Sequence, residues 1–145
     1  MSISFLLTTH LIFMTVAFMI FSINFLVGLT YLIEERRLKQ RKPPLNFRWL
    51  PSLRGLDSFH YNSLLIGFIL LTCGIVVGTL LSKKIMNAYL TDDPRQIASL
   101  VIWSIYAFFL KARLQSGLKG RRGMILSALG FLGVVLAFIA IRHHV

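Results

Sequence analysis

The stretch that decides the fold is residues 5–33, FLLTTHLIFMTVAFMIFSINFLVGLTYLI, which carries no charged side chain before Glu34. A bilayer core about 30 Å thick needs about 20 helical residues, so this run can span it with some tilt. The run has no basic segment in front of it, and it is much longer than the apolar part of a cleavable signal peptide. We therefore interpret it as a transmembrane helix.

Three more apolar runs have the length of a membrane span, and they cover residues 62–81, 96–115 and 124–141. Over the whole chain, 56% of residues are hydrophobic and 14% are charged, whereas soluble domains have about 25% charged residues. Asp93 and Pro94 form a typical helix start before the third run. The sequence predicts an all-α fold in which residues 1–145 form one integral membrane domain of four transmembrane helices.

The basic residues predict the orientation, because cytoplasmic connections of membrane proteins collect Lys and Arg. They concentrate in the 34–61 connection and after the third run: Arg36, Arg37, Lys39, Arg41, Lys42, Arg48, Arg54, Lys111, Arg113, Lys119, Arg121 and Arg122. The 82–95 connection has fewer, so we expect it, the N-terminus and the C-terminus to lie outside. The net charge of +11 then indicates membrane lipids as partners, and nucleic acid is not expected.

Few residues could carry chemistry. A Ser/His/Asp arrangement, a phosphate-binding glycine loop and an HExxH motif are absent, and Cys73 is the single cysteine. Hydrolysis and phosphoryl transfer are therefore not expected, and the chain is predicted not to be an enzyme. Gly74 and Gly78 have the spacing that lets another helix approach closely.

The histidines are the candidate ligands. His10 lies near the outer end of the first run, and His143 and His144 follow the fourth run on the same side. Two imidazoles on opposed helices could supply both axial positions of a haem iron. In the alternative interpretation, His10 is an interfacial side chain and His143 with His144 is a polar tail. His60 is interpreted as a polar anchor at the entrance of the second helix.

An ordered series of short motifs resembles the C-terminal half of the cytochrome c assembly family, which includes the CcsA, ResC and HemX-like proteins. The matching residues are Thr9-His10-Leu11, Leu50-Pro51-Ser52-Leu53, Leu56-Asp57, Gly67-Phe68, Gly74-Ile75-Val76-Val77-Gly78, Asp93-Pro94-Arg95, Trp103-Ser104-Ile105-Tyr106-Ala107, Arg113, Gly120-Arg121 and Gly130-Phe131. This resemblance implies haem handling at the outer face of a bacterial cytoplasmic membrane. It implies haem as the cofactor, with His10 and His143 or His144 as iron ligands.

The chain also departs from the family. The 82–95 connection has no tryptophan, Lys111 stands where the family has its second intramembrane histidine, and the family's N-terminal helices have no counterpart here. We therefore expect a membrane component of c-type cytochrome biogenesis that binds or presents haem, with another membrane protein of that system or a second copy as partner. The alternatives are a structural or regulatory HemX-like subunit that has lost haem binding and, last, an electron-transfer anchor with a b-type haem.

Overall fold

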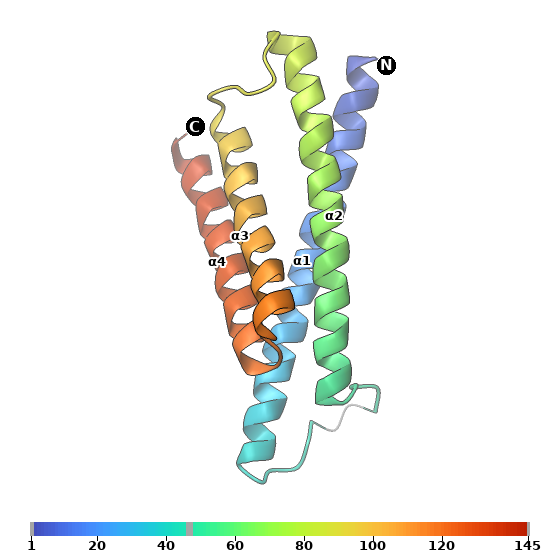
Figure 1. Cartoon of the computed structure of the whole chain (residues 1–145), viewed down its shortest axis with the longest axis vertical. Helices are drawn as coiled ribbons and strands as arrows, with labels where there is room; N and C mark the ends of the chain where they lie inside the picture. Colours follow the sequence, from blue (N-terminus) through green and yellow to red (C-terminus); the bar gives the residue numbers. More distant parts are fainter. Residues whose placement is uncertain (1, 46–47, 145) are drawn as a thin grey trace.

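The computed structural model describes residues 2–45 and 48–144, and all of its regular structure in these ranges is helical. The helices are α1 (Ile3–Lys39), α2 (Leu53–Met86), α3 (Pro94–Ser116) and α4 (Arg121–His144). Figure 1 shows them as an up-and-down bundle of long, roughly antiparallel rods. All four are long and apolar enough to cross a membrane, which confirms the predicted four-span, all-helical membrane fold.

The two ends of the bundle differ. Both chain ends and the α2–α3 connection lie at one end, which we call the terminal end, and the other two connections lie at the opposite, basic end (Figure 1). We call this end basic because most of the arginines and lysines lie in or beside its two connections. An even number of antiparallel helices produces this arrangement.

The connection between α1 and α2 is shorter than the irregular 34–61 segment expected from the sequence. α1 continues to Lys39, because Arg36, Arg37 and Lys39 favour its last turn by complementing the helix dipole. α2 already begins at Leu53, where the Ser52 hydroxyl caps it by accepting a hydrogen bond from the Gly55 N–H at 3.2 Å. Both helices therefore extend into the segment where the basic composition suggested a loop.

α1 and α2 form the most extensive helix–helix contact in the bundle. Along the central part of both helices the buried residues alternate in steps of four and three: Ala17, Phe21, Asn24, Gly28 and Tyr31 on α1, and Leu64, Gly67, Leu71 and Gly74 on α2. This spacing is the heptad pattern of helices that pack side chain into gap along a shared seam. We call the contact the α1–α2 seam.

Glycines determine how closely the seam packs. A Cβ atom on Gly67 would lie 2.8 Å from Cε1 of Phe21, and one on Gly74 would lie 3.2 Å from Sδ of Met14. At Gly78 the same atom would lie 2.8 Å from Cε1 of His10. The close approach predicted for the α2 glycines is therefore made by α1 of the same chain.

Aromatic rings join α3 and α4 to this pair. The Phe21 ring stacks on Tyr106 with ring centroids 4.2 Å apart, and Phe25 stacks on Phe131 at 5.0 Å. Trp103 completes the link, because its indole N–H donates to the Thr72 hydroxyl at 2.9 Å. The aromatic core thus connects all four helices near the middle of the bundle.

We predict that Gly67→Ala destabilises the protein by about 1–3 kcal/mol, because the new methyl group overpacks the seam against Phe21. The matched control is Gly133→Ala, since nothing lies within 4 Å of a Cβ there. The control should be neutral or slightly stabilising, because alanine favours helix over glycine. Thermal unfolding in detergent measures both, and equal behaviour of the two variants would contradict the packing argument.

Candidate functional site

His10 lies at the terminal end of the seam, half-buried between α1 and α2. Its ring atom Nδ1 is 2.8 Å from the backbone carbonyl oxygen of Gly74. A carbonyl oxygen only accepts hydrogen bonds, so Nδ1 must carry the proton and donate it. In the neutral ring, Nε2 is then the nitrogen with the free lone pair.

Nε2 of His10 has no hydrogen-bond partner among the described residues. Unlike the ring nitrogens of His60, it is not among the buried atoms without a partner, so it retains contact with the surroundings of the bundle. An imidazole oriented through one nitrogen and open at the other is the usual arrangement of a metal ligand. The His10 side chain thus has one oriented and one open nitrogen, and its role as a ligand remains a prediction.

His143 and His144 end α4 at the same end of the bundle as His10. His143 is exposed, and the side chain of His144 lies outside the described residues. In Figure 1 the first turns of α1 lie beside α2 and the last turns of α4 lie beside α3, and no hydrogen bond or ring contact joins His10 to His143. The shared ligation of one iron by His10 and His143 or His144 remains a prediction.

Among the described residues, no group of three or more His, Cys, Asp or Glu side chains could hold a metal ion. The described residues therefore offer no cage for a bare ion. An iron that arrives within a porphyrin needs only one or two axial ligands, and a single well-oriented histidine can supply one of them.

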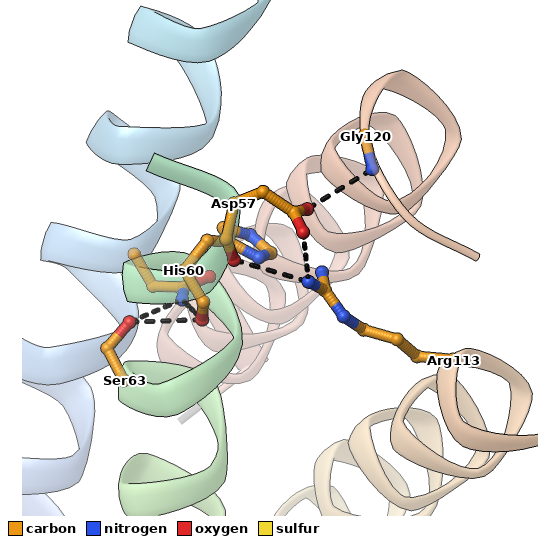
Figure 2. Close-up of polar contacts among 6 residues, drawn as sticks. Asp57, His60, Ser63, Arg113 and Gly120 are labelled. Atoms are coloured by element: carbon orange, nitrogen blue, oxygen red, sulfur yellow. Dashed lines mark hydrogen bonds and ion pairs between the residues drawn. The ribbon is translucent and has the colours of Figure 1, made fainter. Parts of the chain in front are cut away.

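A second polar cluster lies at the basic end, and its contacts were not predicted from the sequence. Arg113 of α3 pairs with Asp57 of α2, with Nη2 3.0 Å from Oδ2, and the same nitrogen donates to the Asp57 carbonyl at 3.2 Å. The other carboxylate oxygen of Asp57 accepts the Gly120 N–H at 3.1 Å (Figure 2). Arg113 is only 6% exposed, so it is a buried tie between helices, whereas the sequence analysis counted it among the basic residues of the inner connection.

Asn24 of α1 makes a further set of hydrogen bonds deeper in the bundle, and these join α1 to α2 and α4. Its amide nitrogen donates to the His60 carbonyl at 2.7 Å and to the Ser63 hydroxyl at 2.8 Å, and its amide oxygen accepts from Ser127 at 3.2 Å. Isolated polar residues in apolar runs were the available signal for this cluster, since membrane interiors tolerate such residues when they pair.

His60 differs most from its prediction, and its interpretation as a polar anchor at the entrance of the second helix is wrong. The side chain is 0% exposed, and both of its ring nitrogens lack a hydrogen-bond partner. The ring edge faces Gly28, and Phe109 meets it edge-on with centroids 6.4 Å apart. α2 begins well before His60, so this residue lies inside the bundle and not at the helix entrance.

Known proteins are similar to this chain in sequence. The sequence model described as cytochrome C assembly protein matches residues 3–144, which is nearly the whole chain. The chain belongs to the cytochrome c assembly protein family.

Curated relatives of this family member carry the name cytochrome c biogenesis protein CcsA. The protein of Synechococcus sp. (strain WH7803) is 34% identical over 87 residues, which are 60% of this chain and 27% of that relative. The protein of Prochlorococcus marinus (strain NATL1A) is 30% identical over 112 residues, or 77% of this chain and 35% of the relative. The matches thus cover about a third of these relatives or less, and no solved structure matches.

The structure also describes two sites that the sequence singled out, Lys111 and the α2–α3 connection. Lys111 is exposed near the basic end of α3. In the α2–α3 connection, the Tyr89 ring is already engaged, because the Lys83 ammonium contacts its hydroxyl and lies 3.9 Å from the ring centroid. Gln96 holds the same connection by accepting from Thr91 and donating to the Tyr89 carbonyl at 2.9 Å. The connection is therefore held by polar contacts, and Tyr89 is its one aromatic residue.

We predict that His60→Leu leaves this family member equally stable or stabilises it by about 1 kcal/mol, because the imidazole is buried without partners. The bond that Asn24 makes goes to the His60 backbone and survives the change. Asn24→Leu is the matched control, since Asn24 is equally buried but fully bonded, and it should destabilise by about 1–3 kcal/mol. Thermal unfolding in detergent compares them. A loss with His60→Leu as large as with Asn24→Leu would show that the ring has a partner in the folded protein.

Proposed function

We propose that this chain is a membrane component of c-type cytochrome biogenesis that binds haem, or presents it, at the outer membrane face without catalysing a reaction itself. Family membership, four helices able to cross a membrane and relatives named for cytochrome c biogenesis support this role. The observation that carries the haem-binding part is the His10 side chain, which is oriented through Nδ1 and free at Nε2.

Haem is the cargo in this proposal, and the surroundings of His10 suit it. Leu7 and Leu11, which precede and follow His10 on α1, are about half exposed. A porphyrin is apolar over most of its area, so such side chains can cover it while an imidazole nitrogen binds the iron. His10 supplies the ligand atom, and His143 or His144 is the candidate for the opposite axial position.

The alternative is a structural or regulatory HemX-like subunit that does not bind haem. The α2–α3 connection supports it, because the connection contains no tryptophan and its tyrosine is engaged by Lys83. This alternative keeps the helical bundle and the polar ties at the basic end. It assigns no role to the free nitrogen of His10, and we therefore rank it second.

The proposal places the chain in the bacterial cytoplasmic membrane with a membrane partner from the same maturation system or a second copy of itself. The support is family membership, since relatives of this chain are named for cytochrome c biogenesis. The close-approach surfaces of α2 do not support a partner, since α1 already occupies them. Any partner must bind elsewhere on the bundle.

We predict that the protein purified in detergent binds added haem with a Soret band and reduced alpha band typical of imidazole ligation. His10→Ala should remove most of this binding, whereas His60→Leu, which changes a histidine enclosed inside the bundle, should retain it. Ala substitutions at His143 and His144 together should convert the spectrum to that of a singly ligated iron. Optical titration measures all four proteins, and a wild-type protein without these bands would favour the structural alternative.

The predicted orientation is tested separately. A reporter that is active only outside should function when fused after Val145 or within residues 85–92, which lie at the terminal end. It should fail near Lys39 or Lys119, because the basic end is expected on the cytoplasmic side. The reverse pattern would place His10 on the cytoplasmic side and exclude presentation of haem outside.

A further inference from the structure

The His10 contact depends on a gap in the surface of α2. The ring rests on the helix so that Nδ1 reaches the Gly74 carbonyl at 2.8 Å, and it does so over the position of Gly78. A Cβ atom on Gly78 would lie 2.8 Å from Cε1 of the ring and 3.0 Å from Nδ1. No other type of residue at position 78 would let the ring keep this place.

Helix geometry explains why the gap must lie four residues after the carbonyl. In an α-helix each carbonyl points along the axis toward the residue four positions later, where its hydrogen-bond partner lies. A side chain at that later position points back toward the preceding turn and covers the carbonyl. Glycine at position 78 therefore exposes the Gly74 oxygen sideways, so that a side chain from a neighbouring helix can bond to it.

We propose that the Gly74 carbonyl and the bare backbone of Gly78 preset His10 as an Nε2 ligand and bias a bound haem iron toward its ferric state. This inference rests on the proposed function for its second half only. Its first half concerns the protein without haem: the ring is fixed as the tautomer that carries its proton on Nδ1. Gly78 is then a positioning residue that acts through His10.

The electronic effect follows from the same hydrogen bond. An imidazole that donates its N–H to a carbonyl becomes a more basic ligand through its other nitrogen, and such partners orient the ring as well. A more basic axial ligand stabilises ferric iron more than ferrous iron, and hydrogen bonding beyond the ligands is one of the ways in which a protein tunes haem potential. The potential of bound haem should therefore fall when this bond is intact.

No competing partner is positioned to reverse the tautomer. Phe13 and Met14 are the side chains nearest to a Cβ on Gly74, and both are apolar. The Gly74 oxygen is the one hydrogen-bond partner that the structure gives to the His10 ring. The arrangement thus leaves Nδ1 as donor and Nε2 as acceptor.

The first measurement uses the haem-free protein. Histidine ring nitrogens are labelled with ¹⁵N, and the spectrum in detergent is compared with that of His10→Gln to assign the His10 signals. We expect the neutral ring to carry its proton on Nδ1 and to leave Nε2 unprotonated. A ring protonated on Nε2, or an equal mixture of tautomers, would overturn the proposal without any use of haem.

The second measurement compares Gly78→Ala with Gly133→Ala, where an added methyl group meets nothing within 4 Å. We expect Gly78→Ala to lose the fixed tautomer, to bind haem about 10- to 100-fold more weakly and to shift the midpoint potential upward, as expected when an outer partner of a ligand is lost. Gly133→Ala should match the wild type in all three. Helical circular dichroism identifies any loss that is merely unfolding, and then the tautomer of the wild type alone decides.

The outcomes separate the two claims. A fixed Nδ1 proton in a protein that binds no haem would refute the proposed function and leave the preset ring standing. Haem binding that requires His10 but is unchanged in affinity and potential by Gly78→Ala would support the proposed function and overturn the role of Gly78.

Discussion

The α1–α2 seam is the constraint on which the rest of the structure depends. Lipid tails are as apolar as leucine, so hydrophobic burial does not bring membrane helices together, and close packing must do so. Here packing is achieved by size matching across the seam: Phe21 against Gly67, Met14 against Gly74 and His10 against Gly78. Because these contacts recur with heptad spacing, they fix one register for two helices of 37 and 34 residues. α3 and α4 pack against this pair of helices.

Polar ties at the basic end add specificity to this packing. Asn24 links α1 to α2 and α4, while Asp57 links α2 to α3 and to the turn that precedes α4. Each tie joins elements that are distant in sequence, and the Asn24 and Arg113 side chains that make them are buried. A sliding or rotated helix would leave a charge or an amide unpaired, so these few groups exclude alternative arrangements that apolar contacts would tolerate. The terminal end has no such tie between α1 and α4 among the described residues.

The sequence predicted the number of helices and their apolar centres, but not which faces they bury. In a soluble protein Phe59 would be assigned to the core and His60 to the surface, yet Phe59 is 51% exposed and His60 is 0% exposed. The same inversion separates Leu114, 70% exposed, from Arg113. Lipid accepts apolar side chains on the outside, so hydropathy carries no information about direction inside a span. His10 was predicted as a candidate ligand from its residue type and its position near the outer end of the first apolar run, and the sequence holds no comparable signal that His60 is buried.

The two histidines of the seam show what separates a ligand from a packed side chain. Each ring rests against a glycine of the opposite helix, His10 against Gly78 and His60 against Gly28. At Gly78 the exposed Gly74 carbonyl accepts a hydrogen bond from Nδ1 of His10 and leaves Nε2 free toward the surroundings. At Gly28 no hydrogen bond reaches the ring, and both nitrogens are enclosed. Burial against glycine is thus common to both, and chemistry differs only where the gap in the helix surface also exposes an acceptor.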